Sequence, residues 1–184
     1  YFLRGLTDAG VGKEFTPDMA GRAWLNYTRN GIGMFWWGGY GISTEHTAYQ
    51  NLKTGIPAPL SGSAKTNGTE AAEQIGGQIF VDTWGLIWPG RPDRAAEYAR
   101  TAACVSHDGE GLHGAAFISA CIAEAFRARS MEAVIEAGLR QIPEDCEYAR
   151  VVLAVREFYR RCPGDFRMCM RFLLDHWGYD RYGG

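Results

Sequence analysis

The stretch EQIGGQIFVDTWGLIWPGRPDRAAEYARTAACVSHDGEGLHGAAF, residues 73–117, decides the fold that we expect. It places a doubled glycine, Gly76-Gly77, inside an apolar helical pattern, followed by a Pro-Gly break, a second helix and a polar turn around His107. Glycine lets backbone approach a ligand or another helix closely, and a helix end beside a small polar turn suits an anion. The stretch therefore predicts successive helices and a candidate ligand site.

Helix signals continue on both sides of this stretch. Thr16 before Pro17, Ser43 or Thr44, Ser130 and Asp165 are expected N-caps. The expected helices are a tail ending at Gly10 and residues 17–27, 44–53, 69–88, 92–105, 114–129, 131–142, 144–161 and 165–176. Residues 30–42 and 57–68, rich in glycine or proline, are expected loops. The pattern predicts an all-α fold over 1–184, a single helical domain without repeats.

The segment 69–88 carries signals for both helix and strand, because its second half, QIFVDTWGLIW, is rich in strand-forming residues. Its alternation is poor and it adjoins a helical start, so helix is favoured over strand. One helical face would then carry the apolar side chains Ala72, Ile75, Ile79, Thr83 and Leu86.

Composition limits the classes of partner. The chain has 184 residues, 46% of them hydrophobic and 22% charged, which is enough to bury a core. The net charge of -2, with both signs interspersed, argues against nucleic acid and against an anionic membrane surface. No apolar run is long enough for a membrane helix. We expect a small-molecule partner, and a chain that is the middle of a larger domain because YFLRGLTDAG reads as the end of a helix.

The cysteines and histidines give no metal or catalytic motif by themselves. Five cysteines without a C-x-x-C pair indicate free thiols in a reducing cytoplasm: Cys104, Cys121, Cys146, Cys162 and Cys169. His107 and His113 lack the spacing of a zinc pair, and HExxH is absent. Ser106, His107 and Asp108 are adjacent, and neighbouring side chains are expected to point apart, so we predict no triad.

The glycine pairs do not match a P-loop or a dinucleotide fingerprint. Gly76-Gly77 inside a helix costs about 1 kcal/mol per residue relative to alanine, so the pair needs a reason. Close helix packing and close approach to a ligand are both compatible with the residues, and the alternatives stay open.

The order of three motifs resembles the ADP-ribosylglycohydrolase family, as in dinitrogenase-reductase-activating glycohydrolases. These motifs are AEQIGGQIFVDTWG at 72–85, WPGRP at 88–92 and AACVSHDGEGLHGA at 102–115. TPDMAGRAWL and TAYQNLKTGIPAP, further upstream, resemble segments of bacterial members. The likeness covers nearly the whole chain, which would be a central segment of the family domain.

The resemblance implies a helical hydrolase that uses two magnesium ions to cleave an N- or O-glycosidic bond to ADP-ribose or a related ribosyl compound. The family's acidic metal motifs lie upstream and downstream of the matched region, so the ligands are expected outside this chain. The segment alone is then expected to be inactive. A non-catalytic member, acting as a binding or crystallin-like structural protein, is the alternative, and a helical interaction module without a small-molecule site is the third reading.

The resemblance also implies substrate-binding residues. His107 matches the family histidine that lines the ADP-ribose site, with its neighbours Ser106, Asp108 and Gly109, and the phosphate-contacting region corresponds to Gly76, Gly77 and Gln78. Two departures stand out. Gln74-Ile75-Gly76 replaces the usual G-N-G, and Phe80 stands where an arginine is usual.

Further candidates come from side-chain chemistry. Phe35, Trp36, Trp37 and Tyr40 in the glycine-rich loop could stack on a base or serve as packing. Glu73 and Asp82 are candidate polar contacts, with a surface or helix-cap role as the alternative.

Overall fold

The computed structural model describes residues 1–10, 14–29 and 37–182, and these contain helices and no strand. The expected all-α fold is confirmed. The chain divides into two compact units, Tyr1–Pro143 and Glu144–Gly184. No helix in the described ranges is long and apolar enough to cross a bilayer.

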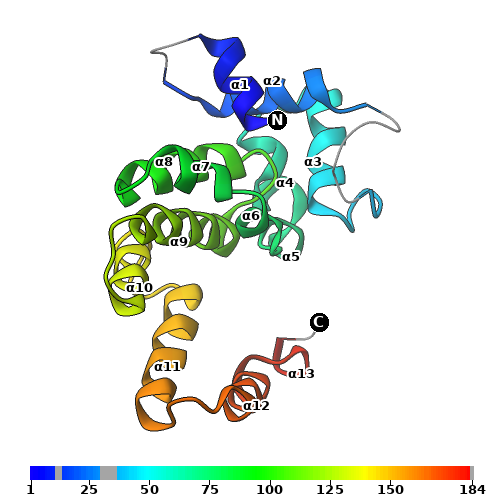
Figure 1. Cartoon of the computed structure of the whole chain (residues 1–184). Coiled ribbons are helices and arrows are strands. Elements are labelled where there is room, and N and C mark those ends of the chain that lie inside the picture. Colours follow the sequence, from blue (N-terminus) through cyan, green and yellow to red (C-terminus); the bar gives the residue numbers. More distant parts are fainter. Residues whose placement is uncertain (11–13, 30–36, 183–184) are drawn as a thin grey trace. The chain divides into compact units, whose positions relative to one another are not determined.

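The first unit contains the helices drawn from blue to yellow in Figure 1. In chain order they are α1 Phe2–Ala9, α2 Pro17–Tyr27, α3 Thr44–Lys53, the 3-10 turn η1 Leu60–Gly62, α4 Ala64–Asn67, α5 Thr69–Ala72, α6 Gly76–Ile79, α7 Asp82–Ile87, α8 Pro92–Ala103, α9 Gly109–Ala125 and α10 Met131–Leu139.

The longest of these helices, α9, is the centre of the unit and packs against α6, α7, α8 and α10. Glycine sets the close approach of two neighbours. A Cβ on Gly85 of α7 would lie 2.5 Å from Ile122 Cβ, and a Cβ on Gly138 of α10 would lie 2.7 Å from Cys121 Sγ. Helices can approach this closely only where one of them lacks a side chain.

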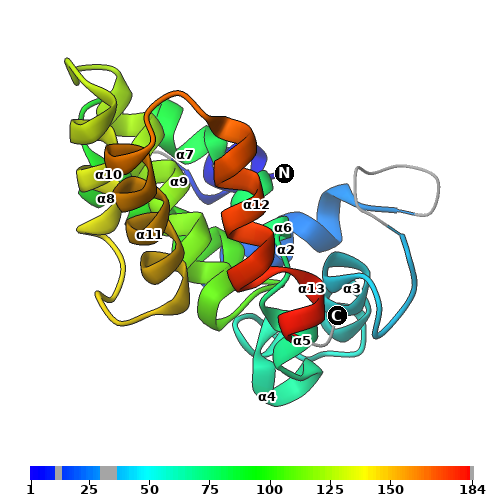
Figure 2. The same cartoon turned by 90° about the horizontal axis from the view of Figure 1, so that it is seen from below.

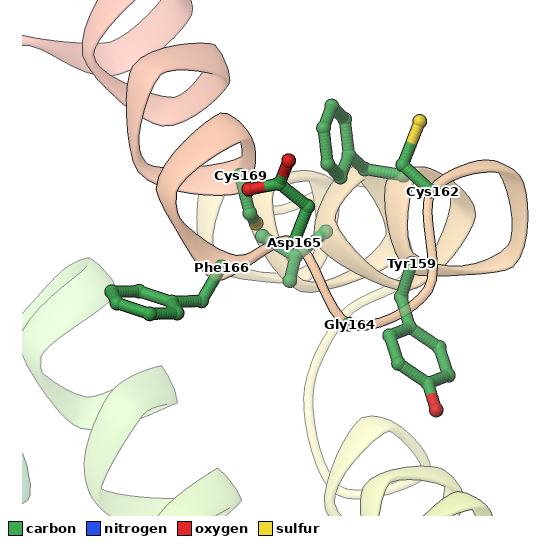
Figure 3. A pocket seen from close by; sticks show the side chains of 8 residues that line it. Tyr159, Cys162, Gly164, Asp165, Phe166 and Cys169 are labelled. Carbon is green, nitrogen blue, oxygen red and sulfur yellow. The ribbon is translucent and has the colours of Figure 1, made fainter.

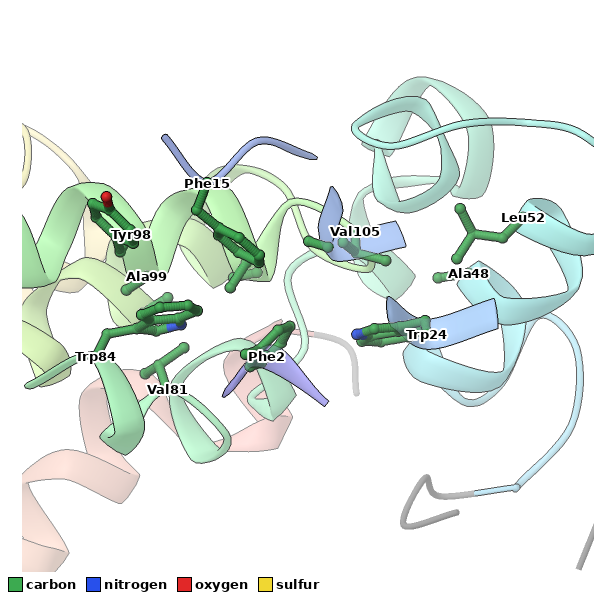
Figure 4. Packing of buried hydrophobic residues seen from close by; sticks show 14 residues of the cluster. Phe2, Phe15, Trp24, Ala48, Leu52, Val81, Trp84, Tyr98, Ala99 and Val105 are labelled. Carbon is green, nitrogen blue, oxygen red and sulfur yellow. The ribbon is translucent and has the colours of Figure 1, made fainter. Parts of the chain in front are cut away.

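The buried core joins the N-terminal helices to this central set. Figure 4 shows Phe15 and Phe2 beside Trp84, whose ring centroid lies 5.1 Å from Phe15 and 5.7 Å from Phe2. Trp24 is also buried and, with Ala48 and Leu52, extends the core toward α3. Large aromatic rings in tilted contact bury apolar surface between α1, α2 and the central helices.

Residues 69–88 are helical, as expected, but the prediction of one continuous helix is wrong. The segment forms α5, α6 and α7, with breaks after Ala72 and after Ile79. Gly76 and Gly77 are poor helix formers, so they weaken a continuous helix over this segment. At each break the chain turns toward a new contact. The expected apolar face is lost with it, because Ile75, Ile79 and Leu86 are about 60% exposed. Val81 and Trp84 are fully buried instead.

Several helix ends were well predicted. Thr16, Ser43, Ser130 and Asp165 accept backbone N–H bonds as N-caps. Other ends differ. The expected loop 57–68 contains η1 and α4, α8 and α9 stop two to four residues early, and α10 stops at Leu139. These ends are decided by local hydrogen bonding that sequence signals specify only loosely.

The second unit contains α11 Glu147–Arg161, α12 Phe166–Trp177 and α13 Tyr179–Tyr182. Helices α11 and α12 are joined by a short turn, drawn in orange in Figure 2. Phe158 and Phe172 stack between them at 5.1 Å. Helix α11 begins at Glu147 with Cys146 as its cap, rather than directly after Pro143 as expected, because the Cys146 thiol accepts the Ala149 N–H.

Candidate functional site

The candidate site is centred on His107, in the turn between α8 and α9. Its side chain is 1% exposed, and its backbone N–H donates to the Ala103 carbonyl at 2.8 Å, which continues the last turn of α8. The imidazole meets the Phe80 ring edge-on, with centroids 5.6 Å apart. The backbone hydrogen bond and the contact with Phe80 therefore hold the His107 side chain inside the protein.

Three glycines surround the imidazole. A Cβ on Gly76 would lie 3.0 Å from His107 Nε2, a Cβ on Gly77 would lie 3.2 Å from Cγ, and a Cβ on Gly111 would lie 3.1 Å from Cδ2. The same Cβ on Gly77 would lie 2.7 Å from the Gly111 carbonyl oxygen. The doubled glycine therefore lets α6 pack closely on α9 and on the histidine ring. Close packing is therefore one reason for the doubled glycine. It accounts for Gly77, whereas the surroundings of Gly76 on its side of the ring differ.

The protonation state of His107 follows from its surroundings. Burial lowers the pKa of the imidazole from 6.5 to about 3, so the ring is neutral at physiological pH. Its Nδ1 lies 2.7 Å from the Ser106 hydroxyl. Nε2 is buried and has no hydrogen-bond partner among residues 1–10, 14–29 and 37–182. A buried polar atom without a partner costs about 1–3 kcal/mol, so this nitrogen needs an explanation.

The expectation that Ser106 and His107 point apart is wrong. The chain leaves α8 in a tight turn at these residues, which brings the hydroxyl onto the ring nitrogen of its neighbour. Asp108 does point elsewhere, so the three adjacent residues form no triad. Both Ser106 and His107 are buried to at least 99%, which leaves the hydroxyl no route to attack a substrate.

Asp108 and Glu73 hold the start of α9. Asp108 Oδ1 accepts the Gly109 N–H at 2.9 Å and Oδ2 accepts the Ala64 N–H at 3.0 Å, so one carboxylate joins α9 to α4. Glu73 Oε1 accepts the Glu110 N–H at 3.1 Å. Gly109 has φ +48, a left-handed conformation that favours glycine, and a Cβ there would meet the Glu73 carboxylate. These carboxylates act as helix caps.

Most of the substrate-binding residues that the resemblance implied therefore lie close together in the structure. Ser106, Gly76 and Gly77 contact the His107 ring, and Asp108 and Gly109 continue its turn. Gln78 lies half-buried on α6 beside Gly77. Their role in substrate binding stays a prediction. Asp82 is exposed in the first turn of α7, where an acidic residue favours the helix start.

Sequence reasoning missed Glu45, a half-buried residue of α3. Its Oε1 would lie 2.0 Å from a Cβ on Gly76, on the side of that glycine that also faces His107 Nε2. Its Oε2 accepts from the Ser43 hydroxyl at 3.3 Å. No sequence signal could have paired Glu45 with His107, because only the packing of α3 and α6 brings the two together.

The aromatic residues of the glycine-rich loop are partly accounted for. Phe35 and Trp36 lie outside the described residues. Trp37 meets His46 and Tyr49 edge-on at 5.0 and 5.4 Å, which is a packing role. Tyr40 donates its hydroxyl to Asn51 Oδ1 at 3.2 Å, and its ring is 64% exposed.

Two hollows differ in chemistry. One, of about 480 Å³, lies beside α5 in the first unit. It is lined by main chain and by polar side chains, among them Thr69, Glu70 and Gln74. The Ala72 carbonyl at the end of α5 accepts the Asp108 N–H, so the same short helix borders this hollow and contacts the His107 turn.

The other hollow, of about 230 Å³, lies in the second unit at the turn between α11 and α12. Figure 3 shows Phe166, Tyr159 and the two thiols of Cys162 and Cys169 around it. Its lining is mostly apolar and holds no cluster of groups for acid, base or metal chemistry. All five cysteines of the chain are free.

The described residues do not fit the magnesium site that the resemblance implies. Magnesium requires an octahedral shell of oxygen ligands, usually from carboxylates and water. The Asp108 and Glu73 carboxylates accept backbone N–H bonds as helix caps. Within either unit, the described part of the chain brings no three carboxylate, imidazole or thiol ligands together around one point.

Comparison with known proteins agrees with the motifs. The family model described as ADP-ribosylglycohydrolase matches residues 1–180. Comparison with curated proteins and with solved structures found no significant match. The family match spans both units and nearly the whole chain, including the turn that holds His107. The chain therefore belongs to the ADP-ribosylglycohydrolase family.

Proposed function

We propose that this chain is part of a magnesium-dependent hydrolase that cleaves an N- or O-glycosidic bond to ADP-ribose or a related ribosyl compound. The family match over residues 1–180 carries this proposal. The helical fold and the buried histidine in the Ser-His turn support it, because a rigid imidazole beside a helix start is suited to orient a polar ligand.

In this proposal the chain supplies ligand-binding walls. His107, Ser106, Asp108 and Gly109 form one wall, and α6 with Gly76, Gly77 and Gln78 forms the other. The polar hollow of about 480 Å³ beside α5, which other residues of the first unit line, has the size of a small-molecule site. The two magnesium ions and the acidic residue that activates water would be held by residues outside 1–184. We expect a small-molecule or ADP-ribosylated substrate and neither nucleic acid nor membrane, since the net charge of -2 is evenly spread.

The test uses the full-length protein with magnesium and peptides that carry ADP-ribose on arginine or on serine. Release of ADP-ribose supports the proposal, and its absence with both linkages contradicts it. His107→Ala should weaken ADP-ribose binding at least tenfold, and unchanged binding would remove His107 from the site. His176→Ala, an exposed histidine of α12, is the matched control. The 184-residue segment alone should release no ADP-ribose.

One observation favours the alternative, a family member that binds without catalysis. Phe80 stands where the family usually has an arginine, and its ring packs against Phe2 at 5.6 Å and against His107. The position therefore serves the aromatic core and offers no positive charge to a phosphate. ADP-ribose binding by the full-length protein without turnover of either linkage would favour this alternative.

A further inference from the structure

Helix α12 of the second unit packs on α11 with one of its sides. On that side, Phe172 stacks on Phe158 of α11, with ring centroids 5.1 Å apart. Cys169, three residues before Phe172, lines the hollow that Phe158 also lines. The Trp177 indole N–H donates to Glu147 Oε1 at 2.7 Å, which ties the end of α12 to the start of α11. These contacts fix which side of α12 faces α11.

Another side of α12 carries a stripe of three exposed apolar residues. Phe166, Met170 and Leu174 follow one another every four residues, so they lie along one line of the helix. Their side chains are 71%, 51% and 60% exposed. Single exposed apolar residues are common on proteins, whereas a continuous row of them marks an interaction site. This row is as narrow as a helix–helix seam, whereas a membrane-binding helix has a broader apolar face.

Two arginines border one edge of this stripe. Arg167 and Arg171 directly follow Phe166 and Met170 in the sequence, and the Arg167 guanidinium lies 5.8 Å from the centre of the Phe166 ring. Neither arginine forms an ion pair within the residues that the structure describes, whereas three arginines of α11 pair with glutamates of their own helix. Asp175, the one carboxylate of α12, lies further round the helix from the stripe. The edge of the stripe is therefore positively charged.

We propose that this side of α12 docks an amphipathic helix of a partner protein that carries glutamate or aspartate beside its own apolar row. The partner's apolar row would cover the stripe, and its carboxylates would pair with Arg167 and Arg171. A second copy of α12 fits less well, because it has no carboxylate beside its stripe. The proposed substrate walls all lie in the first unit, so this docking surface is separate from hydrolysis.

The test uses the full-length protein and two fluorescent peptides of about 18 residues, long enough to form a helix. Both peptides carry leucine along one face, and the residues beside the leucines are glutamate in one peptide and lysine in the other. We expect the glutamate peptide to bind about tenfold more tightly in fluorescence anisotropy at about 0.05 M salt, and less selectively at high salt. Arg167→Glu combined with Arg171→Glu should reverse the preference, and Met170→Ser should weaken both peptides.

Arg129→Glu is the matched control, because it reverses the charge of an exposed arginine in the first unit. It should leave the preference unchanged. The proposal is overturned if neither peptide binds, if both bind equally, or if the preference for glutamate survives the double reversal. Binding to phosphatidylserine vesicles that Met170→Ser abolishes would assign the stripe to a membrane surface and also overturn it. A dimer in analytical ultracentrifugation that Met170→Ser abolishes would overturn it in favour of a second copy.

Discussion

Substituting Gly77 by alanine tests the packing reason for the doubled glycine. The new Cβ would lie 2.7 Å from the Gly111 carbonyl oxygen and 3.2 Å from His107 Cγ. Neither neighbour can turn aside, because one is backbone of α9 and the other is a ring buried to 99%. Overpacking of a rigid core costs about 1–3 kcal/mol, and the better helix propensity of alanine returns about 1 kcal/mol. The difference is a net loss of up to about 2 kcal/mol.

Thermal unfolding followed by circular dichroism measures this loss. For a chain of this size, a loss of up to about 2 kcal/mol lowers Tm by up to roughly 8 °C. Gly76→Ala is the matched comparison: its new methyl group would meet the flexible end of Glu45 and the His107 ring, at 3.0 Å from Nε2, but no backbone atom among its three nearest neighbours, so it should lower Tm by less. A Gly77→Ala protein that melts at or above the wild-type temperature would refute close packing of α6 on α9 as the reason for glycine here.

Three further outcomes are expected. Burial lowers the pKa of His107 from 6.5 to about 3, so between these pH values the unfolded chain binds a proton that the folded chain does not. The free energy of unfolding, measured with urea, should therefore fall on acidification from pH 6.5 by up to about 1.4 kcal/mol per pH unit. His107→Gln should lack this contribution. Burial raises the pKa of the Cys104 thiol to about 12, so mass spectrometry should find Cys104 unmodified by iodoacetamide at pH 8 until the protein is unfolded, and rapid labelling of the folded chain would contradict this. Asp108→Ala removes the acceptor of two backbone N–H groups and should cost about 1–3 kcal/mol in thermal unfolding, against about 1 kcal/mol or less for Asp165→Ala at the exposed start of α12.

Local signals explain why the order of helices could be predicted. Thr16 before Pro17, Ser43, Ser130 and Asp165 each accept a backbone N–H close in the chain, so their capping role depends on neighbouring residues alone. The all-α class follows from these signals and from helical spacing. The prediction of one helix over residues 69–88 was wrong because the breaks place Val81 and Trp84 in the core. Helices distant along the chain impose this arrangement.

The motifs were also enough to identify the family and to select His107, because both depend on contiguous residues. They could not reveal that Ser106 contacts the ring of its neighbour, since that depends on how the chain leaves α8. They could not reveal Glu45 either, because α3 and α6 are far apart along the chain.

The sequence by itself therefore determined the helical class, the caps, the family and the histidine turn, all of which rest on interactions between near neighbours. Only the tertiary structure decided what the doubled glycine does. Gly77 closes the contact between α6 and α9, whereas Gly76 makes room for the Glu45 carboxylate beside the His107 ring. The physical reason is that the role of a residue without a side chain is set by the groups that other helices bring against it.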